Sequence, residues 1–205
     1  MPANPITTAS NEFDAAVAKH SLLQHPFYVA WSMGTLPVDA LKDYASEYGA
    51  FIATISQGWR AAGEQEIAGI EEGHSRVWEQ SFAASLNTSV AAPQVKEVAD
   101  LVALADEMFG EYATALGALY AFEAQQPFTA QSKLKGLSEH YAHLPARCAD
   151  YFRMHAADYD EPALLSAMID ALNSGERQRA LEACDRMGKA LYQALSGIHA
   201  PFLSN

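Results

Sequence analysis

The stretch GIEEGHSRVWEQSF, residues 69–82, combines a helical hydrophobic pattern with two ionisable side chains on the face that this pattern buries. Apolar residues recur at Ile70, Val77 and Phe82, with the spacing of an amphipathic helix. The same line passes over Glu71 and His74, which are three residues apart and therefore point in one direction. A helix that buries an acid and an imidazole together needs a partner for them elsewhere in the chain.

The rest of the chain follows the helical pattern as well. Alternating runs of Val, Ile and Thr are missing, and Ala, Leu, Glu, Gln and Met dominate, which favours helices over strands. We therefore predict one all-α domain over residues 1–205, built as a helical bundle. Pro127 is expected to end one helix. The expected helices cover about 10–23, 25–34, 37–59, 64–86, 94–109, 111–125, 129–142, 146–158, 163–173 and 175–196.

Composition argues against several classes of partner. The 205 residues include 25 acidic and 13 basic side chains, for a net charge of −12, and no cluster of Lys or Arg. Nucleic acids and anionic membrane surfaces are therefore poor partners. No apolar run approaches the ~20 residues that span a bilayer, and the N-terminal segment lacks the features of a secretory signal. Cys148 and Cys184 lack metal-site spacing, so we expect reduced, buried thiols in a cytoplasmic protein.

Two further helices also carry ionisable groups on their apolar lines. Glu123 continues the line of Leu116, Leu119 and Tyr120, and His155 continues the line of Cys148, Tyr151 and Phe152. A buried carboxylate without a partner costs several kcal/mol, and Lys and Arg are scarce on these lines.

A divalent metal is one way to neutralise such groups. Glu side chains and Glu-x-x-His pairs hold metal pairs in helical bundles, and this mixture of ligands suits iron or manganese. The candidate ligands are Glu71, His74, Glu123 and His155. The other interpretation is structural, since a core histidine often bonds a backbone carbonyl.

Tyrosines and one lysine form a second group on the inward lines. The tyrosines are either amphipathic core residues or phenols beside an oxidising centre. Lys133, one turn before Leu137, either extends to solvent or, if buried near Glu123, serves as a charge partner or proton donor. The tyrosines of this group are Tyr28, Tyr44, Tyr48, Tyr120, Tyr141 and Tyr151.

Together these motifs resemble the heme-oxygenase-like diiron oxidases, a group within the TenA-like and PqqC-like helical proteins. Within the group, the resemblance is strongest to the Chlamydia-type self-consuming synthases of para-aminobenzoate, which are associated with death domains. The likeness covers nearly the whole chain, and LYAFEAQQP, residues 119–127, is its most specific piece. The other segments that carry it are HPFYVAWSMGTLPVDALKDYASEYGAFI, EEGHSRVWEQSFAASL and DYFRMHAADYDEP.

The resemblance implies a seven-helix core, a homodimer, two metal ions of iron or manganese, and O₂ as co-substrate. By motif, Glu71, His74, Glu123 and His155 would be the metal ligands. Tyr28 would be the tyrosine that is consumed, and Lys133 the amino donor for a product used in folate biosynthesis. Tyr44 and Tyr151 match further inward tyrosines of the group.

The sequence departs from the group at its last ligand helix. The group carries His-x-x-x-Asp-x-x-His, whereas here His155 is followed by AADYDEP. Aligned without a gap, Tyr159 and Pro162 occupy the last two ligand positions, and both ligands are lost. With one deletion, Asp158 and Glu161 fill these positions; in either alignment the second histidine is absent. The resemblance thus leaves open a weakened or single-metal site.

Three functions remain open at this level. The first is a metal-dependent, oxygen-activating oxidase, which includes para-aminobenzoate synthesis from Tyr28. The second is a metal-free TenA-like or PqqC-like enzyme that acts on a pyrimidine or quinone precursor. The third is a non-catalytic helical protein that binds a partner.

Overall fold

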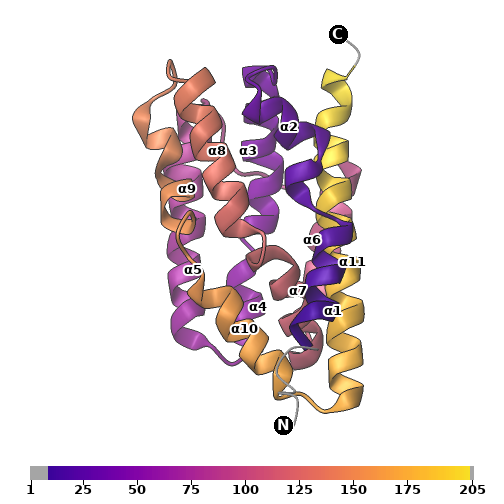
Figure 1. Cartoon of the computed structure of the whole chain (residues 1–205). Coiled ribbons are helices and arrows are strands. Elements are labelled where there is room, and N and C mark those ends of the chain that lie inside the picture. The colour runs from indigo at the N-terminus through magenta and orange to yellow at the C-terminus, as the bar shows by residue number, and fades with distance from the viewer. Residues whose placement is uncertain (1–8, 204–205) are drawn as a thin grey trace, which may run out of the picture.

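The computed structural model describes residues 9–203 and shows a bundle of helices with no strand in that range, which confirms the predicted all-α class (Figure 1). None of the helices described is long and apolar enough to cross a membrane. Short 3-10 helices are η2 (Leu22–Gln24), η4 (Ala146–Ala149) and η5 (Ala200–Phe202), and η3 (Trp78–Ala83) is a π-helix. The α-helices are α1 (Ala9–Lys19), α2 (Pro26–Ser32), α3 (Val38–Ile52), α4 (Ile55–Ala61), α5 (Gln65–Val77), α6 (Lys96–Met108), α7 (Tyr112–Glu123), α8 (Gln126–His140), α9 (Asp150–His155), α10 (Asp160–Asp170) and α11 (Ser174–His199).

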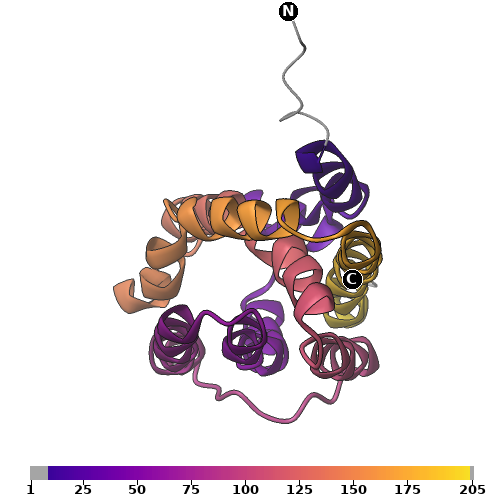
Figure 2. The same ribbon diagram turned by 90° about the horizontal axis from the view of Figure 1, so that it is seen from below.

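The helices surround a core that is rich in aromatic rings. The long helix α11 packs against α6 and α7, and α10 crosses one end of the bundle (Figures 1 and 2). Helices α5, α8 and α9 lie on the side away from α11 (Figure 1). Rings from three elements meet in the middle, where Trp78 contacts Tyr44, Phe82 and Phe152 at centroid distances of 5.5, 5.0 and 5.9 Å.

Two predicted boundaries were wrong. The helix expected over 37–59 is broken after Ile52, because both the N–H and the hydroxyl of Thr54 donate to the carbonyl oxygen of Phe51, at 2.8 and 2.7 Å. Pro127 does not end a helix but lies in the first turn of α8. Proline is tolerated there, since the first N–H groups of a helix have no partner within it.

The crossing of α7 and α11 depends on Gly117. A Cβ atom at this position would overlap the carbonyl oxygen of Ala180 on α11. The two backbones therefore approach more closely than any side chain would permit. This contact holds α7 in place, and α7 carries Glu123 at its last turn.

We expect Gly117→Ala to destabilise the protein by about 1–3 kcal/mol or more, since the helices must separate to admit the methyl group. Gly69→Ala is the matched control: it adds the same group where nothing lies within 4 Å, and it should raise stability by about 1 kcal/mol through helix propensity. Urea denaturation of both variants measures the difference. Equal stability of the two variants would contradict the close crossing.

Candidate metal centre

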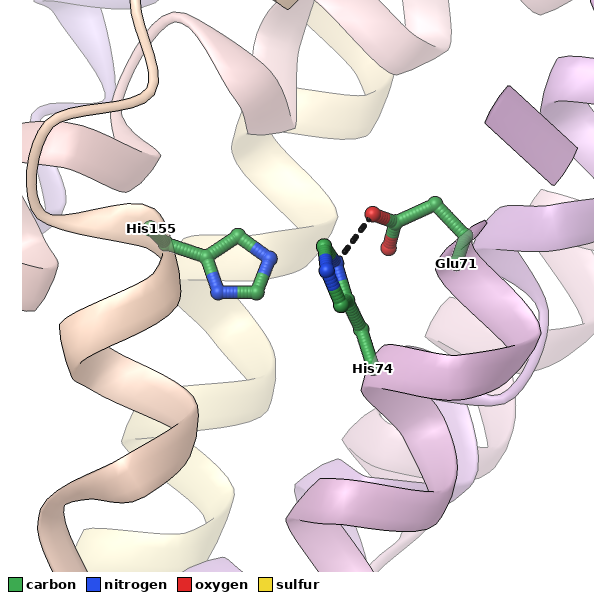
Figure 3. A group of neighbouring side chains, drawn as sticks. All are labelled: Glu71, His74 and His155. Atoms are coloured by element: carbon green, nitrogen blue, oxygen red, sulfur yellow. Dashed lines mark hydrogen bonds and ion pairs between the residues drawn. The ribbon is translucent and has the colours of Figure 1, made fainter. Parts of the chain in front are cut away.

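Three of the predicted ligands converge in the interior. Glu71 and His74 lie one turn apart on α5, and His155 is the last residue of α9 (Figure 3). Their candidate ligand atoms all lie within 4.8 Å of one another, and all three residues are buried. Ligand atoms around one first-row ion lie up to about 4.4 Å apart, since each bond is about 2.0–2.2 Å. The spread of the three atoms is therefore close to that of a metal site.

Each side chain of this group is held in a defined orientation. Glu71 Oε1 and His74 Nδ1 are 2.5 Å apart, and the rings of His74 and His155 have centroids 4.6 Å apart. His155 Nδ1 donates to the carbonyl oxygen of Tyr151 at 2.9 Å. Because that nitrogen carries the proton, Nε2 keeps its lone pair, and Figure 3 shows it directed toward His74 and Glu71. A metal-binding histidine needs this arrangement.

The helix changes its pitch directly after the two α5 ligands. At Trp78 the α-helix becomes the π-helix η3, which adds a residue to the turn and widens it. Trp78 Nε1 donates to the carbonyl oxygen of Ala45 on α3 at 2.8 Å, and the Trp78 ring is almost wholly buried. The wide turn thus brings Trp78 into the core while His74, one turn earlier, still faces α9.

Further carboxyl groups surround the three residues. Glu123 ends α7, is 2% exposed, and its Oε1 has no hydrogen-bond partner. Burial, together with the charges of Glu161, Glu71 and Asp158, raises the pKa of Glu123 well above its usual range. Burial, with Glu71 and Asp158, raises the pKa of Glu161 to about 8. These directions mean that the carboxyl groups repel one another in a site of low dielectric constant.

The residues present fit a divalent metal. No Lys or Arg forms an ion pair with Glu71, Glu123 or Glu161 in the part of the chain that is described. Carboxylates without a cation, an orphaned carboxyl oxygen and two imidazoles are a donor set that a metal ion of the iron or manganese type satisfies. Glu71, His74 and His155 meet directly; Glu123, Glu161 and Asp158 act on one another electrostatically.

An open cleft of about 550 Å³ leads to the group from outside. His74 lines it, together with Asp158 and Glu161 from the segment where the sequence departs from the diiron group. The rest of its wall is formed by Ile67, Ile70, Met154, Asp160 and Leu164. A metal ion or a small molecule therefore has a route to His74 without opening the bundle.

The predicted tyrosine and lysine lie next to each other, and aromatic side chains separate them from the candidate metal ligands. Lys133, which is 4% exposed, holds its Nζ 4.7 Å from the ring centroid of Tyr28 and 5.2 Å from that of Phe152. The hydroxyl oxygens of Tyr28 and Tyr44 are 2.9 Å apart. Burial alone lowers the pKa of Lys133 to about 7. We call Tyr28, Tyr44, Lys133 and Phe152 the tyrosine–lysine chamber.

A series of ring contacts joins this chamber to the candidate ligands. The Tyr44 ring stacks on Tyr48 with centroids 4.9 Å apart and meets Trp78 at 5.5 Å. Trp78 meets Tyr151 at 4.9 Å, and Tyr151 meets His155 at 4.3 Å. No gap wider than an ordinary ring contact separates Tyr28 from His155.

Two of the six predicted inward tyrosines lie outside both the tyrosine–lysine chamber and the series of ring contacts. The Tyr120 hydroxyl donates to Asp14 Oδ1 on α1 at 2.7 Å, and that of Tyr141 donates to the carbonyl oxygen of Leu36 at 2.8 Å. The structural interpretation holds for these two. The interpretation of Lys133 as a lysine that extends to solvent was wrong, and no ion pair joins it to Glu123 among the described residues.

Two further residues hold these tyrosines in place, and sequence reasoning missed one of them, Gln126. Gln126 is buried and donates to the Tyr151 hydroxyl at 3.1 Å, and His25 caps the helix of Tyr28. No sequence pattern indicated a role for Gln126, because glutamine is common near the start of a helix. For His25, its place directly before Pro26 was an indication of the cap.

Comparisons with known proteins agree with this fold. No protein-family model matches the chain. The chain is 27% identical over 231 residues to a 4-aminobenzoate synthase of Nitrosomonas europaea, covering 97% of this chain and 94% of that protein. It is 25% identical over 213 residues to a 4-aminobenzoate synthase of Chlamydia muridarum, covering 93% and 90%.

Solved structures extend the likeness to the fold. A Shewanella denitrificans domain of unknown function with a heme oxygenase-like fold matches with a TM-score of 0.78 at 14% identity, over 98% of this chain and 94% of that one. A TenA homologue from Pseudomonas syringae matches with a TM-score of 0.72 at 14% identity, over 98% of both chains. The chain therefore has the heme-oxygenase-like fold of the TenA/PqqC-like group, and in sequence it is similar to 4-aminobenzoate synthases over nearly its whole length.

Proposed function

We propose that the protein is a metal-dependent, oxygen-activating oxidase that makes para-aminobenzoate, with Tyr28 as the source of the ring and Lys133 as the source of the nitrogen. The observation that carries the proposal is the position of the Lys133 amine, buried 4.7 Å from the centroid of the Tyr28 ring. A series of ring contacts connects that pair to the cluster of Glu71, His74 and His155. The names of the 4-aminobenzoate synthases that the chain resembles point to the same product.

The metal would be held by the buried acids and imidazoles. Glu71, His74 and His155 offer three ligand atoms within 4.8 Å, and Glu123 adds a carboxyl oxygen that has no other partner. Asp158 and Glu161 are the candidates for the remaining positions. A bound pair of iron or manganese ions would supply the electrons and the oxidising power for reaction with O₂. The protein keeps this centre away from bulk water except at the cleft beside His74.

Lys133 is suited to act as a nitrogen donor because its amine is poorly protonated. With a pKa of about 7, roughly half of the side chains carry an unshared electron pair near neutral pH. An exposed lysine would be almost fully charged there. The walls of the tyrosine–lysine chamber also fix the direction of the amine, since rings of Tyr28, Tyr44 and Phe152 lie within 5.6 Å of it.

The tyrosines between the candidate metal ligands and the tyrosine–lysine chamber can carry an electron and a proton. The hydroxyl groups of Tyr44 and Tyr28 share a hydrogen bond, so the two phenols are coupled directly. Tyr151 lies between Trp78 and His155, and Gln126 holds its hydroxyl group. Oxidation at the metal cluster would thus reach Tyr28 through neighbouring rings.

A TenA-like reaction with a cysteine nucleophile finds less support. Burial raises the pKa of Cys148 and of Cys184 to about 12, so neither thiol is ionised near neutral pH. The homodimer expected from the resemblance remains part of the proposal.

The metal proposal predicts tight binding that depends on the histidines. Protein loaded with Fe(II) or Mn(II) and then desalted should keep one to two ions per chain, measured by elemental analysis. His74→Ala and His155→Ala should weaken binding by roughly 10–100-fold or more. His143→Ala, at an exposed position outside the cluster, should bind as the parent does. Metal content near zero in the parent protein would exclude this site.

The substrate proposal predicts a product derived from the protein itself. Protein grown with ring-labelled tyrosine, loaded with iron or manganese, and given reductant and O₂ should release labelled para-aminobenzoate, detected by mass spectrometry. Tyr28→Phe should release none, whereas Tyr112→Phe, at a surface tyrosine, should match the parent protein. Unlabelled product, or product from the Tyr28 variant, would refute the role of Tyr28.

Lys133→Met should abolish the product and yet stabilise the fold. The folded pKa of Lys133 is lowered from 10.5 to about 7, so the unfolded chain binds more protons between these values, and the lysine destabilises the fold most at low pH. We expect a gain of roughly 1–4 kcal/mol near pH 7 in urea denaturation. The gain should shrink as the pH rises from 7 and vanish only above 10.5, where the lysine is neutral in both states. A pH-independent effect would mean that Lys133 is charged in the folded protein.

A further inference from the structure

The residue that starts the Tyr28 helix makes two directed hydrogen bonds that the proposed function does not use. His25 is 2% exposed and forms the N-cap of α2, where its Nδ1 accepts a hydrogen bond from the backbone N–H of Phe27 at 3.0 Å. Helix α2 has only seven residues, so a single cap is a large part of what holds its first turn. Tyr28 lies in that first turn.

The second ring nitrogen is bonded to α11. His25 Nε2 lies 2.9 Å from Ser196 Oγ, and that hydroxyl donates its own hydrogen to the carbonyl oxygen of Tyr192 at 3.1 Å. Because the serine hydrogen is used there, Ser196 Oγ accepts from His25, and Nε2 carries the proton. Both nitrogens are then satisfied only by the neutral imidazole with its hydrogen on Nε2.

The other protonation forms would break this arrangement. A hydrogen on Nδ1, in the cation or the other tautomer, would face the N–H of Phe27 and remove the cap. Burial, followed by the nearby His199, lowers the pKa of His25 to about 4, which is consistent with a neutral ring. Rings from α11 enclose it, with Tyr192 at 4.4 Å and His199 at 6.4 Å between centroids.

The anchored turn continues into the tyrosine–lysine chamber. The Phe27 ring packs between His199 at 5.6 Å and Tyr44 at 5.2 Å, and the Tyr28 ring lies beside the Lys133 amine. A shift at the start of α2 would therefore move the Tyr28 ring relative to both Tyr44 and Lys133. The distance of 4.7 Å between amine and ring centroid leaves little room for such a shift.

We propose that His25 is a positioning residue for the reaction at Tyr28: its neutral imidazole, protonated on Nε2, ties the first turn of α2 to α11 and so holds the Tyr28 ring beside Lys133. The reaction itself rests on the proposed function. The anchoring by a single tautomer does not, and it can be tested separately.

The first experiment reads the tautomer directly. In protein labelled with ¹⁵N-histidine, the two ring nitrogens of His25, assigned by loss of its signals in His25→Asn, should show the shifts of an unprotonated Nδ1 and a protonated Nε2 at pH 7. A cationic ring, or a hydrogen on Nδ1, would overturn the proposal even if the protein makes para-aminobenzoate.

The second experiment uses the ability of asparagine to cap a helix. His25→Asn keeps an acceptor for the Phe27 N–H, whereas His25→Ala removes it. The alanine variant should lose about 10–100-fold in the rate of product release, and the asparagine variant should recover most of it. His143→Asn is the control, since that histidine is exposed and lies outside α2 and α11. Equal rates for the alanine variant and the parent, or equal losses in the alanine and asparagine variants, would overturn the proposal.

A third measurement, amide hydrogen exchange, does not depend on activity, and amides elsewhere in the bundle report whether the variants remain folded. Ser196→Ala removes only the partner of Nε2, and hydrogen exchange at the amides of Phe27 and Tyr28 should accelerate by tenfold or more in His25→Ala and by less in Ser196→Ala. Amides of α7 should be unchanged in both variants. If the parent protein releases no para-aminobenzoate, the proposed function fails, while the tautomer and the exchange rates still decide the role of His25. Unchanged exchange at Phe27 in His25→Ala would exclude the anchor.

Discussion

The interior of this bundle is organised by the cost of burying charge. Glu71, Glu123 and Glu161 are each less than one-tenth exposed, and no Lys or Arg pairs with them in the described part of the chain. Proteins do not keep several carboxylates in a medium of low dielectric constant without a compensating charge or proton. The directions of the pKa shifts at Glu123 and Glu161 express that cost. A divalent ion bound among these carboxyl groups would offset that free-energy cost.

The aromatic side chains that separate the buried carboxyl groups from Lys133 matter as much to the site as the candidate ligands do. A lysine is the natural partner for a buried carboxylate, and this chain buries one, Lys133, in the same core. Direct pairing with Glu123 would raise the pKa of the lysine and occupy the carboxyl oxygen. Trp78, Tyr151 and Phe152 lie between the two places, in contact with one another at 4.9 to 5.9 Å. Separation leaves the carboxyl groups available for a cation and keeps the pKa of the Lys133 amine low.

Sequence reasoning predicted the helices and the shared buried face of Glu71 and His74 because both follow from local periodicity. The spacing of Glu71 and His74 fixes a common face on one helix, and this holds whatever the rest of the fold does. The helix break at Thr54 could not be predicted from the sequence, since it depends on a hydrogen bond from the Thr54 hydroxyl to a carbonyl oxygen within the turn. The burial of Lys133 was equally hidden. Whether a lysine on an apolar line reaches solvent depends on which helices cover it, and that is a tertiary property.

The absence of the second histidine of the diiron motif bears on which ion the proposed site would prefer. Glu161 is buried and lines the same cleft as His74, and burial together with the charges of Glu71 and Asp158 raises its pKa to about 8. In the proposed site Glu161 would stand in place of an imidazole, and the donor set would hold two imidazoles and four carboxyl groups. Oxygen-rich sets favour harder ions, and manganese gains relative to copper and zinc, which prefer nitrogen and sulfur. The altered segment also lines the open cleft beside His74, so in the proposed site it would affect both the preferred ion and the surface that an entering ion first meets.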